Sequence, residues 1–162
     1  MRIGHGYDIH CLEADPSGEG LTLAGLQIPF AKKFIAHSDG DVAIHALIDA
    51  LLGAAAMGDI GQHFPDTDLK YQNADSKALL RLVMDKLRNH DYIVNNVDLT
   101  IIAQKPKLAC YISLMVEILS GLLNTSVNNI NIKAKTNEHC DSLGREEAIA
   151  VFAVVTIKQN NI

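Results

Sequence analysis

Two short stretches of the sequence carry residues suited to binding a metal ion. Asp8 and His10 lie two positions apart in a segment that reads as a β-strand, so both side chains should leave the same face of that strand. A carboxylate and an imidazole at this spacing suit zinc, but the Asp-x-His pattern is short and common. Taken alone, the pattern is more often a polar pair near the end of a strand than a metal site.

The second stretch runs from His37 to His45. His37 precedes the expected start of a helix, where free backbone N–H groups and the helix dipole favour a phosphate. His45 lies one turn inside that apolar helix, where a lone histidine is usually part of the core. Asp8, His10 and His45 together would nevertheless supply three ligands and leave a fourth tetrahedral position open, as in catalytic zinc sites. Asp49, four residues after His45, either orients a ligand or is a solvated helix residue.

Four further carboxylates could hold a hard cation such as Mg²⁺ together with the phosphates of a substrate. These residues are Asp59, Asp66, Asp68 and Glu138. Because no pattern in the sequence ties them together, ordinary loop carboxylates are the simpler interpretation.

The elements that must position these residues follow from apolar periodicity and from helix caps. The expected strands are Arg2–Leu12, its partner Leu21–Ile28, and then Val97–Ala103, Ile130–Ala134 and Ala148–Ile157. The expected helices are Val42–Ala56, Ser76–Asn89 and Pro106–Leu123, with Pro106 in the first turn. This order predicts an α/β (α+β) sandwich, in which one mixed sheet carries helices on one face and residues 1–162 form a single domain.

The last expected strand, Ala148–Ile157, is apolar on both faces rather than alternating. Such a strand must be covered on both faces, and three helices can cover only one face of a small sheet. We therefore expect the other face to meet another subunit; a barrel-like monomer is the alternative.

The composition excludes several classes of protein. Of the 162 residues, 48% are hydrophobic and 20% are charged, which excludes a disordered chain. The net charge of −5 gives no reason to expect a nucleic-acid partner. Neither a secretory signal nor an apolar run of the ~20 residues that cross a bilayer is visible, so no membrane partner is expected. The odd number of cysteines, three, favours reduced thiols and a cytoplasmic location.

Long motifs along the chain resemble those of the 2-C-methyl-D-erythritol 2,4-cyclodiphosphate synthases. They are Met1–His10, Ala36–His45, Leu51–Gly61, Phe64–Asp68, Ile101–Lys107 and Lys133–Glu138. The motifs occur in family order and at family spacing, so the resemblance covers essentially the whole chain.

The resemblance implies a cyclisation in the non-mevalonate isoprenoid pathway. The 2-phosphate of 4-diphosphocytidyl-2-C-methyl-D-erythritol 2-phosphate would attack the β-phosphorus of the same molecule, releasing CMP and forming the 2,4-cyclodiphosphate. The resemblance also implies a homotrimer with active sites between neighbouring subunits. It further implies a central cavity that could take an isoprenoid diphosphate, with Arg145 facing it.

Particular roles are implied for residues that match the family motifs. Asp8, His10 and His45 fall on the ligands of one zinc ion per subunit, Glu138 falls on the residue that helps to hold Mg²⁺ or Mn²⁺, and His37 and Thr136 fall on transition-state stabilisers. The implied substrate contacts are Asp8, Ile9, His10, His37, Ser38, Asp59, Ile60, Gly61, Phe64, Pro65, Asp66, Thr67, Asp68, Ala103, Gln104, Lys105, Pro106, Lys107, Leu108, Ala109, Lys135, Thr136, Asn137, Glu138, Ser142 and Arg145.

Two segments depart from the commoner family pattern. Lys135 stands where threonine is usual, and Asp141–Arg145 reads Asp-Ser-Leu-Gly-Arg where Gly-Phe-Thr-Gly-Arg is usual. The resemblance therefore does not define the contact made by Ser142 or the shape of the central cavity.

Two other classes of function compete with a cyclase. A catalytically idle trimer could hold CMP-like nucleotides or terpenoid phosphates, although a binder would not need the ligands of both metals. A zinc hydrolase could use bound water, although no spare general base is evident beside the three zinc ligands.

Overall fold

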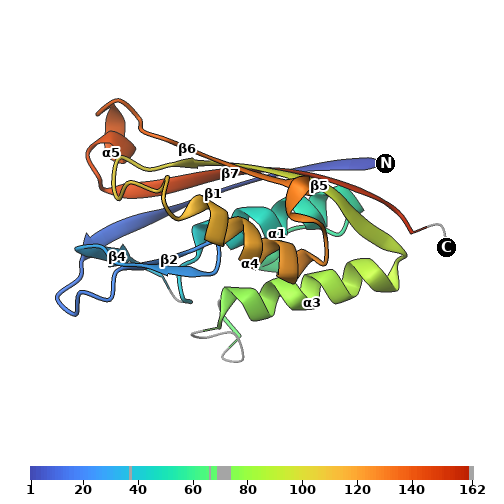
Figure 1. Ribbon diagram of the computed structural model, residues 1–162. Coiled ribbons are helices and arrows are strands. Elements are labelled where there is room, and N and C mark those ends of the chain that lie inside the picture. Colours follow the sequence, from blue (N-terminus) through green and yellow to red (C-terminus); the bar gives the residue numbers. More distant parts are fainter. Residues whose placement is uncertain (37, 66, 69–73, 161–162) are drawn as a thin grey trace.

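The main sheet of the fold has five strands and is mixed (Figure 1). The computed structural model describes residues 1–36, 38–65, 67–68 and 74–160. The strands of the sheet are β1 (Arg2–Ala14), β4 (Lys32–Phe34), β5 (Tyr92–Ile102), β6 (Ile130–Lys135) and β7 (Ala148–Gln159), in the order β4-β1-β7-β5-β6. Only β5 and β6 pair in parallel. The predicted class, a mixed α/β fold with helices against one sheet, is confirmed.

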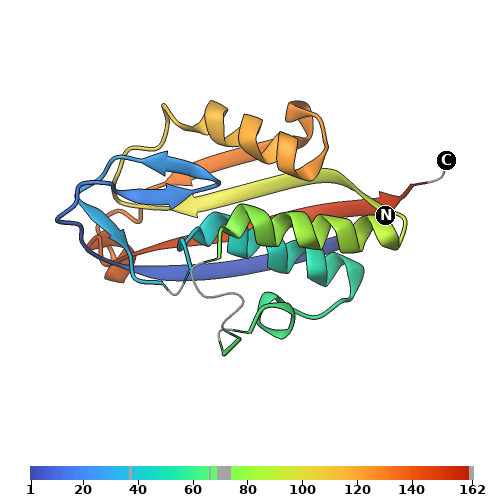
Figure 2. The ribbon, with the colours of Figure 1, turned by 90° about the horizontal axis from the view of Figure 1, so that it is seen from below.

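The long helices lie on one face of the sheet (Figure 2). The three long ones are α1 (Val42–Ala55), α3 (Ser76–Asn89) and α4 (Ile112–Leu123). Short elements complete the chain: the hairpin β2 (Leu21–Leu23) and β3 (Leu26–Ile28), the helices α2 (Ile60–His63) and α5 (Asp141–Gly144), and the 3₁₀ turn η2 (Val127–Asn129). None of the described helices has the length and apolar character needed to cross a bilayer.

Several elements differ from the prediction. Strand β4 was not expected, and it pairs with β1 where Leu21–Ile28 was expected to pair. Strand β5 begins at Tyr92 rather than Val97. The segment Leu21–Ile28 does not pair with β1, because Ala24 and Gly25 both adopt positive φ angles of 52° and 78° and fold the segment back on itself as a separate hairpin. Helix α4 begins at Ile112 rather than Pro106, and Pro106 lies in the preceding loop after a cis peptide bond.

The first strand and the first long helix pack in backbone contact. A Cβ atom added at Gly4 would lie 1.8 Å from the carbonyl oxygen of Ala50, and one added at Gly6 would lie 1.9 Å from that of Ala46. Only glycine permits this approach. The approach brings the helix face that carries His45 against the strand that carries Asp8.

Replacing Gly6 by alanine should therefore lower the free energy of unfolding by about 3 kcal/mol, since the added methyl group would force the helix off the strand. Gly121 in α4 is the control, because an added Cβ meets no atom within 4 Å there. Gly121→Ala should raise the stability by about 0.5–1 kcal/mol. Urea unfolding with a metal chelator present measures both; a Gly6→Ala variant as stable as the parent would contradict the packing.

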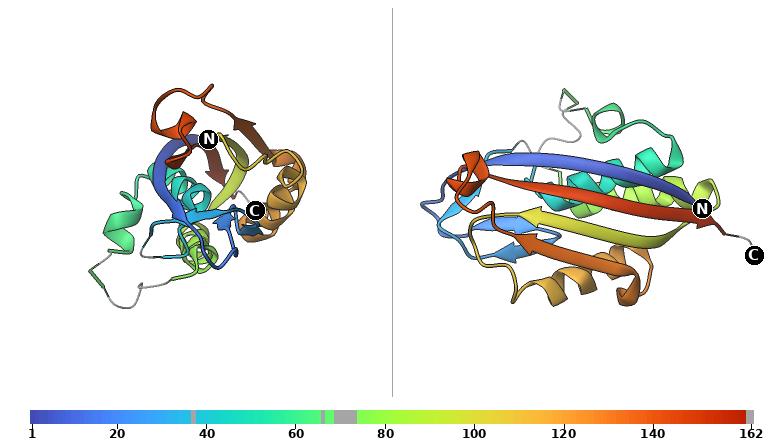
Figure 3. Two further views of the ribbon diagram at one scale, coloured as in Figure 1. Left: turned by 90° about the vertical axis from the view of Figure 1, so that its left-hand side faces the viewer. Right: turned by 90° about the horizontal axis from the view of Figure 1, so that it is seen from above.

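Figure 3 shows, in its right-hand view, the face of the sheet that is turned away from the long helices. Exposed apolar side chains form a patch on this face. We call Ile3, Tyr7, Ile9, Phe152 and Val154 the outer patch; their exposed fractions range from 36% to 70%. Tyr7 and Phe152 are register partners on β1 and β7, and their ring centroids are 4.8 Å apart. No described element covers the outer patch, so β7 is not enclosed in a barrel-like monomer.

Candidate metal centre and active site

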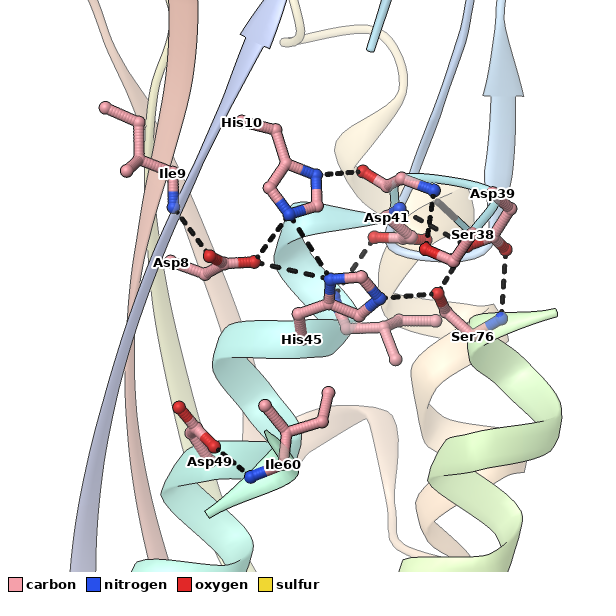
Figure 4. A network of polar contacts seen from close by, with 12 residues as sticks. Asp8, Ile9, His10, Ser38, Asp39, Asp41, His45, Asp49, Ile60 and Ser76 are labelled. Carbon is pink, nitrogen blue, oxygen red and sulfur yellow. Dashed lines mark hydrogen bonds and ion pairs between the residues drawn. The ribbon is translucent and has the colours of Figure 1, made fainter. Parts of the chain in front are cut away.

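Asp8, His10 and His45 converge on one point beside the start of α1 (Figure 4). Asp8 Oδ2 lies 3.0 Å from His10 Nε2 and 3.3 Å from His45 Nδ1, and the two nitrogens are 3.4 Å apart. The side chains are 28%, 15% and 13% exposed, in that order, so the cluster is sheltered but reachable from solvent. The structure thus brings together the three residues that the sequence singled out.

The contacts in this cluster favour the ionised form of Asp8, which lies between the two imidazole rings. Burial raises the pKa of Asp8, but the hydrogen bonds and positive charge of His10 and His45 outweigh it and hold the pKa well below its usual value. Burial lowers the pKa of His10, yet the contact with Asp8 leaves the net pKa raised above 6.5. One oxygen and two nitrogen donors within 4.8 Å of one another fit the preferences of zinc.

Asp41 fixes the start of the helix that carries His45. It is fully buried and caps α1, and its Oδ1 accepts the N–H of Ile44 at 3.0 Å. The same carboxylate accepts the N–H groups of Ala24 at 2.9 Å and Gly25 at 2.6 Å. The expected start of this helix just after Ser38–Asp41 is confirmed, but the acidic residue is the cap itself and the first turn holds none. The cap also ties the β2–β3 turn to α1.

Asp49 fills neither of its two expected roles. Its Oδ1 accepts the N–H of Ile60 at 2.8 Å, so it anchors the start of α2 against α1. Burial raises the pKa of this carboxyl, although the hydrogen bond from Ile60 lowers it. Asp59 caps α2 through the N–H of Gln62 at 2.9 Å. Asp49 therefore positions the Asp59-Ile60-Gly61 turn, where substrate contacts are expected.

A second group of expected residues lies at the end of the parallel pair β5 and β6. The Thr136 hydroxyl donates to Glu138 Oε1 at 2.7 Å. The Ala103 N–H donates to the Lys135 carbonyl at 2.9 Å and joins the two loops that follow these strands. The segment expected to hold cytosine therefore lies beside the segment expected to hold Mg²⁺ or Mn²⁺.

The chain does not bring the two groups into one cluster. Asp8 and His10 lie on β1, whereas Thr136 and Glu138 follow β6, and strands β7 and β5 separate β1 from β6. Because β1 and β5 are both antiparallel to β7, the two groups nevertheless lie at the same end of the sheet.

The remaining expected residues differ in what they offer a ligand. Within Ala103–Ala109, the side chains of Ala103, Gln104 and Leu108 are buried, whereas those of Lys105, Lys107 and Ala109 are exposed. Phe64 is buried as well, with 7% exposed. His37 and Asp66 lie outside the described residues.

Other expected contacts already have partners. Arg145 forms two hydrogen bonds to Glu147 at 2.9 and 3.0 Å, and Lys105 pairs with Glu146 at 3.1 Å. The Ser38 hydroxyl accepts the N–H of Gly40 at 3.1 Å.

Sequence reasoning missed two contacts around these groups. The buried Ser76 hydroxyl lies 2.9 Å from His45 Nε2, although the sequence showed Ser76 only as the start of a helix. Gln104, with 8% exposed, accepts the N–H of His139 at 3.3 Å and holds the loop that contains Glu138. These pairs are separated by 31 and 35 residues, so no local pattern could have indicated them.

Comparison with known proteins identifies the family of this chain. Residues 1–158 match the YgbB family. The 2-C-methyl-D-erythritol 2,4-cyclodiphosphate synthase of Cellvibrio japonicus is 52% identical over 158 residues, or 98% of each chain. The bifunctional IspDF of Campylobacter jejuni has a TM-score of 0.91 at 40% identity, with 98% of this chain and 42% of that chain covered. The CDP complex of Plasmodium falciparum IspF has a TM-score of 0.86 at 34% identity, with 99% and 97% covered. The chain belongs to the YgbB family.

Proposed function

We propose that this chain converts 4-diphosphocytidyl-2-C-methyl-D-erythritol 2-phosphate into 2-C-methyl-D-erythritol 2,4-cyclodiphosphate and CMP. This is the cyclisation step of the non-mevalonate isoprenoid pathway, performed by a phosphorus–oxygen lyase. The observation that carries the proposal is the convergence of Asp8, His10 and His45 in a chain 52% identical to a synthase of that name. The CDP-bound relative supports a cytidine diphosphate substrate. We place the enzyme in the cytoplasm and treat residues 1–162 as one synthase domain.

The reaction is an exchange of phosphorus–oxygen bonds within one molecule. An oxygen of the 2-phosphate bonds to the β-phosphorus, and the bond from the β-phosphorus to the oxygen of CMP breaks, so no water is consumed. Asp8, His10 and His45 would hold zinc, which supplies a Lewis acid for a phosphate oxygen. The exposed Glu138 carboxylate would hold Mg²⁺ or Mn²⁺, since such ions commonly use one carboxylate together with substrate phosphates.

Positioning and hydrogen bonding are the chain's own contribution. His37 and Thr136 would donate hydrogen bonds to phosphate oxygens as negative charge spreads in the transition state. The Thr136 hydroxyl has one proton and donates it to Glu138 in this structure. The hydroxyl can donate this proton to the carboxylate or to a phosphate oxygen, but it cannot make a full hydrogen bond to both at once. The roles of Thr136 and Glu138 are therefore coupled.

The substrate ends would bind in different loops. Ser38 and the Asp59-Ile60-Gly61 turn would hold the methylerythritol phosphate and the ribose side, and the Phe64–Asp68 loop would close over the methylerythritol. Ala103–Ala109 would form the cytosine pocket. Backbone groups of this loop would recognise the edge of the base, and the exposed Lys107 would contact the cytidine end.

A substrate analogue tests the reaction class. 4-Diphosphocytidyl-2-C-methyl-D-erythritol lacks the 2-phosphate and offers only hydroxyl groups as weaker internal nucleophiles, so a cyclase should release CMP from it far more slowly than from the full substrate. A zinc hydrolase would still release CMP from it, because water would be the nucleophile. CMP release from the analogue at the rate of the full substrate would contradict the cyclase.

We further propose a homotrimer with active sites between subunits. The outer patch supports it, because an uncovered apolar face of this kind marks an interface. The separation of the β1 and β6 groups supports it as well, since a neighbour could complete each site. An isoprenoid diphosphate could bind in the central cavity near Arg145, where it would compete with Glu147. The Lys135 and Asp141–Leu143 departures would shape this region.

Light scattering tests the assembly. The parent protein should have three times the chain mass of 17.6 kDa. Phe152→Asp should dissociate it, since a charge would be buried without a partner at the interface. Leu114→Asp is the matched control, because Leu114 is 49% exposed on α4 and lies outside the outer patch. A parent protein of 17.6 kDa, or equal dissociation by both variants, would contradict this interface.

A further inference from the structure

The two histidines of the metal centre are held through opposite ring nitrogens (Figure 4). His10 Nδ1 lies 2.9 Å from the carbonyl oxygen of Gly40. A carbonyl oxygen only accepts, so Nδ1 carries a proton, and Nε2 faces Asp8. In His45 the order is reversed: Nε2 lies 2.9 Å from the Ser76 hydroxyl, and Nδ1 faces Asp8 and His10.

A carboxylate behind Ser76 sets the direction of its hydrogen bonds. Ser76 is fully buried, and its hydroxyl is in very close contact with Asp39 Oδ1. Asp39 Oδ2 also accepts the backbone N–H of Ser76 at 3.0 Å. Because a carboxylate only accepts, the Ser76 hydroxyl donates to Asp39 and uses its lone pair to accept from His45. Nε2 of His45 must then carry a proton, so Nδ1 is the nitrogen left to bind a metal ion.

We propose that Ser76 and Asp39 are positioning residues that hold His45 with its proton on Nε2 and present Nδ1 to the metal ion. The inference rests on the metal assignment in the proposed function. Partners that fix the tautomer and orientation of a ligating histidine typically contribute about 10–100-fold to metal affinity. The arrangement also joins the start of α3 to the metal centre.

Capping of α3 does not account for the Ser76 hydroxyl. The helix has its own cap in Asp75, whose Oδ1 accepts the N–H of Lys77 at 2.9 Å. Asp75 is exposed, and none of its hydrogen bonds reaches a metal-centre histidine. Asp75 is therefore a matched control: its loss weakens the same helix end without touching His45.

Zinc titration of the full chain against a chromophoric chelator provides the first test. Ser76→Ala should weaken zinc binding by about 10–100-fold, whereas Asp75→Ala should bind zinc as the parent does. Ser76→Ala with the parent's affinity would overturn the proposal, and so would an equal loss in Asp75→Ala. A parent protein that binds no zinc would overturn the metal assignment as well, so the two failures can be told apart.

Nitrogen-15 NMR of the histidine rings provides a readout that a merely structural role would not move. In the zinc-bound parent protein, His45 should carry its proton on Nε2 and bind the ion through Nδ1, and in Ser76→Ala part of the protein should bind the ion through Nε2 instead. This measurement on the parent protein does not depend on whether a variant folds. A parent His45 protonated on Nδ1 would overturn the proposal.

Discussion

His45→Ala should remove most of the zinc and lower turnover on the order of 10³-fold, because the loss of a Lewis acid costs several kcal/mol of transition-state stabilisation. Asp8 and His10 would remain as a pair on β1, with no ligand from α1. The fold should survive, because alanine favours a helix and the buried apolar residues of α1 remain to pack against the sheet.

Elemental analysis and circular dichroism measure the zinc content and the fold of this variant. The matched control is His90→Ala, because His90 is an exposed histidine at the end of α3 and should not affect zinc. Equal zinc content in the parent protein and in His45→Ala would refute the assignment of His45 as a ligand.

Thr136→Val should lower kcat and kcat/KM together by about 10²–10³-fold, with KM little changed. An interaction made mainly in the transition state has this signature. Valine is nearly isosteric with threonine, and Thr136 lies beyond β6, so zinc content should be unaffected. The contrast is Lys107→Ala at the proposed cytidine end, which should raise KM more than it lowers kcat. If Thr136→Val kept full kcat or raised only KM, Thr136 would be a substrate contact alone.

The bond from Thr136 to Glu138 adds a control to this experiment. Glu138→Gln should keep its zinc and lose turnover, together with any response to added Mg²⁺ or Mn²⁺. A double-mutant cycle then separates the two residues. If the hydroxyl acted only by holding Glu138, Thr136→Val would have no further effect in the Glu138→Gln background. We expect a further loss, because the hydroxyl also donates to the phosphate.

Parts of the fold with strong local signals could be predicted from the sequence. Helices α1 and α3 were predicted to within a residue, because Asp41 and Asp75 cap them and their apolar residues follow the helical period. The sequence also showed that β7 is apolar on both faces, and Phe152 and Val154 lie on the face that none of the described helices covers. The partner subunit expected on that face stays a prediction.

Elements decided by backbone conformation or by distant contacts could not be predicted. Nothing local indicated that Ala24 would adopt a positive φ angle, so the hairpin was taken for one strand. The cluster of Asp8, His10 and His45 could be predicted because their side chains together make a ligand set and all three fall within the family motifs. Ser76 resembled an ordinary helix start, because its contact with His45 depends on how α1 and α3 pack.

Phosphorus NMR of the products tests the cyclase most directly, with CMP measured in the same incubation of the parent protein and the full substrate. We predict one CMP for each substrate consumed, no inorganic phosphate, and a second product whose two phosphorus atoms couple to each other as a diphosphate. Water attack would instead leave two uncoupled phosphate monoesters or free phosphate, and an idle binder would leave the substrate intact. Either of these results would contradict the proposed cyclisation.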